Sequence, residues 1–246
     1  MTSSSTIILI AAVAPALVLG YYIYRRDKYE HEPVSQLIKG FVFGALSVLI
    51  AGPLEQLLVM LGLAPAEPQT WIACIWDAFF GVALVEEGVK LFFLWLLLRR
   101  NKYYDEMMDG VVYAAMVGLG FAAAENISYL VSNIESWQSV AVSRALFAIP
   151  GHFMFAVTMG YYYSKQHFYH VSAWERNKVL IMPIMLHGTY DAVLMIMNIT
   201  PAMSGLLFLF FLVFCLLMPK YARRKIKELL EDDEMQHKVK DLTLYL

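Results

Sequence analysis

The chain has 246 residues and a near-neutral charge balance, with 19 lysines and arginines against 21 aspartates and glutamates. Hydrophobic residues make up 59% of the sequence and charged residues 16%, whereas soluble domains contain about 45–50% and about 25%. This composition, with a mean hydropathy of +0.56, excludes a water-soluble globular protein and a disordered chain. The charge balance also argues against nucleic-acid binding. The two cysteines, Cys74 and Cys215, lie in apolar runs, so no disulfide framework or zinc finger is predicted.

Several apolar segments are long enough to cross a bilayer as helices, which takes about 20 residues each. They span residues 6–24, 36–63, 71–98, 110–133, 138–163, 178–197 and 202–219. Each segment is continuously apolar rather than alternating in polarity, which favours helices over a β-barrel. The sequence therefore predicts an all-α, polytopic membrane helix bundle with about seven transmembrane helices.

The basic residues set the orientation of these spans. All of the 19 lysines and arginines except Lys90 and Arg144 lie in alternate predicted loops or in the C-terminal segment. The segments that hold them are 25–39, 99–108, 164–178 and 220–246. By the positive-inside rule these segments are cytoplasmic, so the N-terminus is expected outside and the C-terminus in the cytoplasm. No basic residue precedes the first apolar run, which favours a retained anchor over a signal peptide. We expect residues 1–219 to form the membrane domain and residues 220–246 a charged cytoplasmic helical tail.

Ionisable residues also fall inside the predicted spans, where an isolated charge costs about 2.5–3.5 kcal/mol. They are Glu55, Asp77, Glu86, Glu87, Lys90, Glu125, Arg144, His152, His187 and Asp191. If each stood alone, their combined cost would exceed a fold's net stability of about 5–15 kcal/mol. They must therefore pair, bind a cation, contact internal water or stay protonated, and function is the default explanation.

The third span carries Glu86, Glu87 and Lys90. At about 100° per residue, Lys90 falls angularly between the two glutamates. One ammonium can thus neutralise one carboxylate and leave the other free, as acid–base chemistry requires. The alternative is a structural ion pair that holds two helices together. Asp77 points to the opposite side of this helix from Glu86 and is left out of the site, whereas Glu55 cannot be assigned a place.

The next three spans add further candidates. Glu125 and His152 lie on stripes of small residues, where helices approach closely. The alternatives are a protonated, hydrogen-bonded carboxyl and a packed structural histidine. Arg144 lies about two turns from His152 and is a candidate counterion for the acids. His187 and Asp191 are one turn apart on one helix face, so they can bind one metal ion, or the aspartate can orient an imidazole.

In this order, the motifs resemble those of the PrsW family of intramembrane proteases. They are Glu-Glu-x-x-Lys at Glu86, Glu87 and Lys90, Phe-x-x-x-Glu-Asn at Phe121, Glu125 and Asn126, a helix carrying His152, and His-x-x-x-Asp at His187 and Asp191. The similarity covers residues 71–197, and the segment 30–63 fits the family's general layout. In the wider group of CAAX-processing and bacteriocin-related membrane proteases the second motif ends in His, so Glu125 favours the PrsW branch.

The resemblance implies that the chain hydrolyses a peptide bond in or near the bacterial cytoplasmic membrane. Relatives act on single-pass membrane proteins such as anti-sigma factors, as the first cut of a signalling cascade. Residues 1–219 would then be the protease domain. The expected partners are a single-pass membrane substrate and the lipid bilayer.

A hydrolytic mechanism needs a base for water, a group that stabilises the oxyanion and a proton donor for the leaving amine. The candidate catalytic residues are Glu86, Glu87, Glu125, His152 and His187, supported by Lys90, Asn126, Arg144 and Asp191. Glu87 is preferred as the base, with Glu86 held by Lys90. A divalent metal, with zinc favoured, would be bound by residues among His152, His187, Asp191 and Glu125. A glutamate-activated water without a metal is the alternative.

Two other classes of protein fit the same intramembrane charges. A proton- or cation-coupled transporter also uses buried acids and histidines, but transporters tend to show inverted repeats, and none is found here. A non-catalytic scaffold with a buried polar network is the third possibility. The crowding of the polar residues into spans three to six favours an enzyme over both.

Overall fold

The computed structural model describes residues 3–243, with side chains described from residue 5 to residue 239. Every regular element in this range is helical, which confirms the predicted all-α class. In chain order they are α1 (Ser3–Tyr24), α2 (Val34–Met60), α3 (Trp71–Trp76), η1 (Asp77–Ala83), α4 (Leu84–Leu98), α5 (Met107–Ser132), α6 (Trp137–Ser143), η2 (Arg144–Ala148), α7 (Ile149–Phe168), α8 (Ala173–Ile199), η3 (Pro201–Met203) and α9 (Ser204–Thr243).

Six of the helical stretches within the described residues are long and apolar enough to cross a membrane. They are Ser5–Tyr24, Val34–Met60, Met107–Ser132, Trp137–Phe168, Ala173–Ile199 and Pro201–Val239. The remaining predicted span, 71–98, is a continuous rod formed by α3, η1 and α4, with Glu86, Glu87 and Lys90 along it. The prediction of a polytopic helical membrane protein is confirmed.

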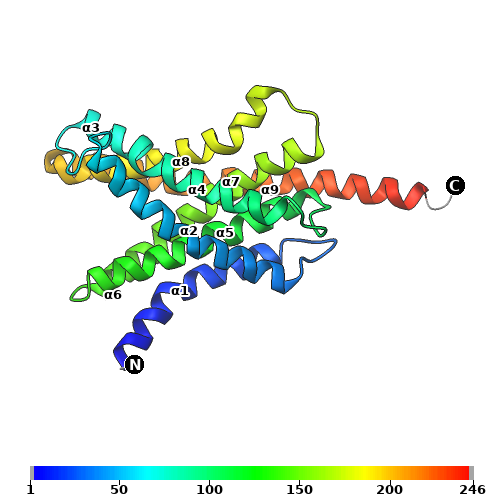
Figure 1. Cartoon of the computed structure of the whole chain (residues 1–246), viewed down its shortest axis with the longest axis horizontal. Helices are drawn as coiled ribbons and strands as arrows, with labels where there is room; N and C mark the ends of the chain where they lie inside the picture. Colours follow the sequence, from blue (N-terminus) through cyan, green and yellow to red (C-terminus); the bar gives the residue numbers. More distant parts are fainter. Residues whose placement is uncertain (1–2, 244–246) are drawn as a thin grey trace.

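Helix α5 is the centre of the bundle (Figure 1), and nearly all of its apolar stretch is buried among α1, α2 and α7. Glycines allow this close packing. A Cβ atom added at Gly44 of α2 would lie 1.9 Å from the carbonyl oxygen of Val117 on α5, and one at Gly120 would lie equally close to the carbonyl oxygen of Phe41. Gly118 likewise faces Ala156 of α7, so the small-residue stripes predicted on these two spans do meet.

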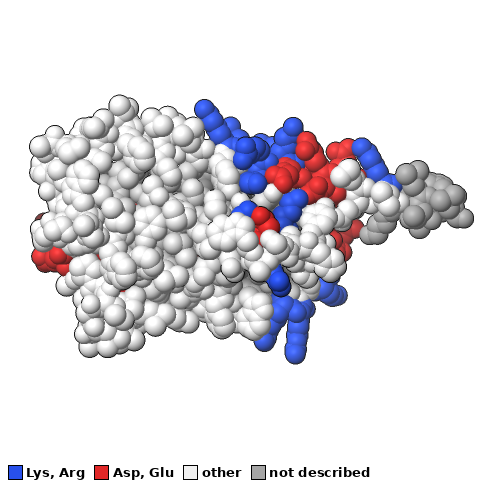
Figure 2. All heavy atoms as spheres, turned by 90° about the horizontal axis from the view of Figure 1, so that it is seen from above, with Lys and Arg blue, Asp and Glu red and all other residues white. Residues whose placement is uncertain are grey.

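Charge is distributed unevenly along the molecule. Figure 2 shows a broad uncharged zone, with the lysines and arginines gathered at one end around the base of the protruding C-terminal helix. The N-terminus lies at the opposite end of the bundle from the C-terminus (Figure 1). Helix α9 passes the predicted domain boundary at residue 219 without a break, and Ala222, Ile226 and Leu229 of its charged half are buried against the bundle. The predicted tail is therefore part of a continuous helix. It carries many charges, and one of its faces packs against the bundle.

Two π-helical segments interrupt the rods that carry the site. Segment η1 ends three residues before Glu86, and η2 begins at Arg144 and ends four residues before His152. A π-turn bonds residue i to residue i+5 and rotates the following residues relative to a regular α-helix. Such turns are rare and occur often at functional sites. Here η1 lies just before Glu86, and η2 contains Arg144 and lies just before His152.

Candidate active site

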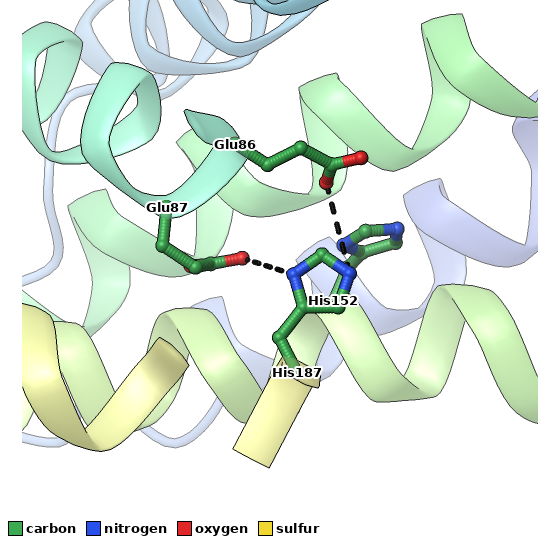
Figure 3. Close-up of side chains that lie close together, drawn as sticks. All are labelled: Glu86, Glu87, His152 and His187. Carbon is green, nitrogen blue, oxygen red and sulfur yellow. Dashed lines mark hydrogen bonds and ion pairs between the residues drawn. The ribbon is translucent and has the colours of Figure 1, made fainter. Parts of the chain in front are cut away.

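The first turn of α4 presents Glu86 and Glu87 to the interior of the bundle, as Figure 3 shows. Lys90 Nζ lies 3.0 Å from Glu86 Oε2 and 2.8 Å from Glu87 Oε1, and all three residues are buried. The predicted placement of one ammonium between two carboxylates is confirmed. Because the lysine contacts both acids, it holds their carboxylates in fixed positions without neutralising the pair completely.

Helix α8 brings His187 to the same point. Its Nδ1 lies 2.9 Å from Glu87 Oε1, and its Nε2 lies 3.1 Å from Asp191 Oδ2 one turn along the helix. The predicted pairing of His187 with Asp191 is therefore present. The aspartate holds the outer ring nitrogen and fixes the imidazole with its other nitrogen toward Glu87, as carboxylates next to metal-binding or catalytic histidines commonly do.

Helix α7 supplies the second imidazole. His152 Nδ1 lies 3.1 Å from Lys90 Nζ, and its Nε2 lies 3.0 Å from Glu125 Oε2. A lysine ammonium only donates, so Nδ1 accepts and Nε2–H donates to the glutamate. Each histidine thus presents Nδ1 to a residue of α4, His152 to Lys90 and His187 to Glu87, and Nε2 to a carboxylate behind it.

Arg144 of η2 closes the polar network on its far side. Its guanidinium pairs with Glu125, and its Nε donates to Asn126 Oδ1 over 2.8 Å. Asn126 in turn donates to the carbonyl oxygen of Ala12 on α1 over 2.9 Å. The predicted counterion role of Arg144 is consistent with these contacts, and Asn126 positions the arginine from behind.

Aromatic rings wall this network from the apolar bundle. Lys90 Nζ lies 3.9 Å from the centroid of the Phe121 ring, and Phe155 stacks on His187 with the ring centroids 4.8 Å apart. The two imidazoles are 5.2 Å apart and nearly perpendicular. These rings restrict the conformations of the Lys90 and His187 side chains. They also keep the local dielectric constant low, so the interactions between charges are stronger than in water.

A cavity of about 420 Å³ opens onto the network. Its acidic and basic lining residues are Glu55, Glu86, Glu125, Arg144, His152, His187 and Asp191. Glu87 is fully buried behind this surface, whereas the side chain of Glu86 is 7% exposed and faces the cavity. Glu86 is thus the one of the two adjacent acids that water in the cavity can reach.

The structure therefore gathers the predicted site residues from α4, α5, η2, α7 and α8 around one point. Asp77, which was predicted to lie outside the site, lines a separate cavity with Glu55 and Gly81. Glu55 lines both cavities, and no motif or helical spacing links it to the other acids.

The donor set at this point suits a divalent metal of the zinc class. One ligand atom each from Glu86, Glu87, His152 and His187 lies within 4.8 Å of the others, and all four residues are buried. Oε2 of Glu87 has no hydrogen-bond partner among the described residues. Two imidazoles and a carboxylate are a common set of ligands for catalytic zinc. The second nitrogen of each zinc-binding imidazole is usually hydrogen-bonded to a further group such as a carboxylate. Lys90 contacts three of the same groups, so its ammonium and a metal ion would compete for them.

Comparison with known proteins shows to which family the chain belongs. The family model described as "PrsW family intramembrane metalloprotease" matches residues 32–218. The chain belongs to the PrsW family. It is 36% identical over 197 residues to "Protease PrsW" of Clostridioides difficile (strain 630), covering 77% of this chain and 79% of that protein. Two further relatives with the same name are 37% identical over 75% of this chain and 78% of the Geobacillus kaustophilus protein, and 32% identical over 76% of this chain and 82% of the Bacillus subtilis protein.

No solved structure matches this chain. As a PrsW family member, the chain is an intramembrane protease, and its helices are those of a multi-pass bacterial membrane protein. An intramembrane protease acts on membrane proteins within a lipid environment. The family match favours the protease over the transporter and scaffold alternatives.

Proposed function

We propose that the cavity is the site at which a single-pass membrane protein is cut, by water that Glu86 activates. The observation that carries this proposal is the position of Glu86, which faces the cavity, is bonded to Lys90 and lies close to both imidazoles. Glu86 thus replaces Glu87, the sequence-based preference, as the base, because a base must contact the water from which it takes a proton.

The reaction is a general acid–base hydrolysis. A water molecule in the cavity gives a proton to the Glu86 carboxylate while its oxygen attacks the peptide carbonyl carbon. The carbonyl electrons move to the oxygen and form a tetrahedral oxyanion. When the C–N bond breaks, the proton on Glu86 passes to the leaving amine nitrogen, and the carboxylate is restored. Lys90 keeps Glu86 aimed at the cavity throughout.

Arg144 is the proposed donor to the oxyanion. It lines the cavity, and its contacts with Glu125 and Asn126 leave further N–H groups on the guanidinium. A fixed cation in a water-poor site stabilises developing negative charge strongly, because no solvent has to reorganise. Glu125 and Asn126 then serve to hold the arginine in place.

The same residues offer a place for a metal ion. We propose that His152, His187 and Glu87 would hold it, with Glu125 and Asp191 orienting the imidazoles rather than serving as ligands. A bound zinc ion supplies a Lewis acid that acidifies water and polarises a carbonyl. Chelation tests this part separately from the rest. Proteolysis that stops with a strong chelator and returns with zinc supports metal dependence, whereas activity unaffected by chelation leaves Glu86 and its water as the complete mechanism.

The substrate class that we propose is a single-pass protein of the anti-sigma type, cut in the cytoplasmic membrane at the start of a signalling cascade. The test compares the new protein N-termini in membranes of cells that produce the wild-type chain or the Glu86→Gln variant at equal levels. We expect new termini within or beside the transmembrane segments of single-pass proteins only with the wild type. Identical termini in both membranes would contradict the proposal.

A further inference from the structure

A second cluster of buried acids lies away from the cavity, where the loop after α1 meets the start of α5. Its members are Asp27, Glu32, Glu106, Asp109 and Asp233, and none is more than 6% exposed. Carboxylate oxygens of Asp27, Glu106 and Asp109 all lie within 4.8 Å of one another. Three carboxylates this close repel strongly unless a positive charge or protons lie among them.

Some oxygens of the cluster accept hydrogen bonds. The bonds run from the backbone N–H groups of Asp105 and Glu106 to Asp109 Oδ2, from those of Met107 and Met108 to Asp233, from the Tyr113 hydroxyl to Glu32, and from His237 to Glu106. His237 is the one basic side chain paired with any of these acids among the residues whose side chains are described. These contacts cap α5 and attach α9, but they leave most of the negative charge uncompensated.

The remaining oxygens have no hydrogen-bond partner of normal geometry within the described residues. They are both carboxylate oxygens of Asp27, Oδ1 of Asp109 and Oε2 of Glu106. Burying a carboxylate without a partner, such as that of Asp27 with 1% exposure, costs free energy. The four oxygens therefore indicate a place for a positive charge.

We propose that Asp27, Glu106 and Asp109 bind one divalent cation of the oxygen-preferring class, Ca²⁺ or Mg²⁺. The unpaired atoms that could ligate the ion are all carboxylate oxygens, which these hard cations prefer over imidazole or sulfur. A cavity of about 80 Å³, lined in part by Glu106 and Asp233, lies beside the cluster and has room for water ligands of the ion.

The cation would fasten three parts of the chain that are distant in sequence. Asp27 belongs to the loop between α1 and α2, whereas Glu106 and Asp109 form the capping box at the start of α5. Glu106 also holds His237 of α9. The ion therefore stabilises the charged end of the bundle, at a site separate from the proposed catalytic one.

Binding and stability of the full-length protein in detergent test this site. After treatment with a chelator, the protein is titrated with CaCl₂ and, separately, with MgCl₂, while bound ions per chain and the thermal unfolding midpoint are measured. Asp27→Asn is the variant, because it is isosteric and removes no hydrogen bond. Glu231→Gln is the matched control, since it removes one exposed acid from the same end of the molecule.

We expect the wild type and Glu231→Gln to bind one more ion per chain than Asp27→Asn, with a rise in the unfolding midpoint that Asp27→Asn lacks. The stronger of the two titrations identifies the ion. Equal binding and equal stabilisation in all three proteins, or no binding by the wild type at millimolar concentration, would overturn the proposal and leave shared protons as the compensation. If Asp27→Asn does not fold, Tb³⁺ luminescence sensitised by Tyr113 in the wild type decides, and Ca²⁺ or Mg²⁺ must displace that signal. Any catalytic metal is common to all three chains, so failure here leaves the proposed protease function untouched.

Discussion

Lys90 Nζ lies 3.1 Å from Nδ1 of His152, which joins two helices through residues 62 positions apart in the sequence. The ammonium donates to this nitrogen and to two carboxylates at once, so all three of its protons have buried acceptors. A lysine in this position sets the tautomer of His152, because it forces Nδ1 to accept. The contact therefore links the glutamates of α4 to the histidine of α7 in one polar network.

Replacing Lys90 tests how far the fold depends on this network. In the variant Lys90→Met, Glu86 and Glu87 keep their buried positions and lose their cation. Removing one partner of a buried ion pair costs about 3–5 kcal/mol, so we expect a clearly lower thermal unfolding midpoint together with loss of proteolysis. Lys227→Met is the control, because Lys227 is exposed and its pairing with Glu231 contributes little. Equal midpoints for the two variants would argue against a stabilising role for Lys90.

The role of Arg144 predicts a kinetic effect rather than a structural one. Arg144→Lys keeps the positive charge but loses the fork that spans Glu125 and Asn126, so the donor to the oxyanion is misplaced. We expect kcat to fall by about 10²–10³ with little change in KM, as when one oxyanion donor is removed. Arg99→Lys, at an exposed helix end, serves as the control for changes in membrane insertion. An unchanged kcat in Arg144→Lys would remove this residue from the mechanism.

Asp191 is predicted to act through His187. The variant Asp191→Asn retains the shape of the side chain but weakens the bond that fixes Nε2 of the imidazole. We expect activity to fall by about 10- to 100-fold while the unfolding midpoint changes little. Asp77→Asn is the matched control, because Asp77 lines a different cavity. A similar loss of activity in both variants would indicate a general effect of intramembrane charge.

Two glycines test the helix packing independently of catalysis. A Cβ atom at Gly44 would overlap the backbone of Val117, which cannot move without displacing α5, so Gly44→Ala should destabilise the bundle by about 1–3 kcal/mol or more. Gly205→Ala meets nothing within 4 Å and should be neutral or slightly stabilising, because alanine favours helices by about 1 kcal/mol. Thermal unfolding in one detergent compares the two. Equal midpoints would contradict the close crossing of α2 and α5.

The helical spacing in the sequence predicts contacts within one helix well. The bonds of Lys90 to Glu86 and Glu87 and the pairing of His187 with Asp191 both follow from the α-helical period alone. The composition likewise predicts the membrane-spanning helices, because a bilayer imposes a fixed length and polarity on each span.

Contacts between helices could not be predicted in the same way. Glu55 shares the cavity with Glu86 because α2 packs beside α4, and no spacing along the chain encodes that packing. The period also fails across η1, where a π-turn changes the angle between Asp77 and Glu86. The choice between Glu86 and Glu87 depends on which one faces the cavity. The acid cluster joins Asp27 of a loop to the start of α5 and to α9, and no spacing along the chain links these three parts.

Cleavage by the variants Glu86→Gln and Glu87→Gln, reconstituted in lipid with a single-pass substrate, shows which of the two glutamates activates the water. If Glu86 activates the water, Glu86→Gln remains folded, still binds substrate and yields no product. Glu87→Gln keeps the water-facing carboxylate, so we expect more cleavage from it than from Glu86→Gln, at a reduced rate where Glu87 holds a metal ion. Cleavage by Glu86→Gln at the wild-type rate would exclude Glu86 as the base.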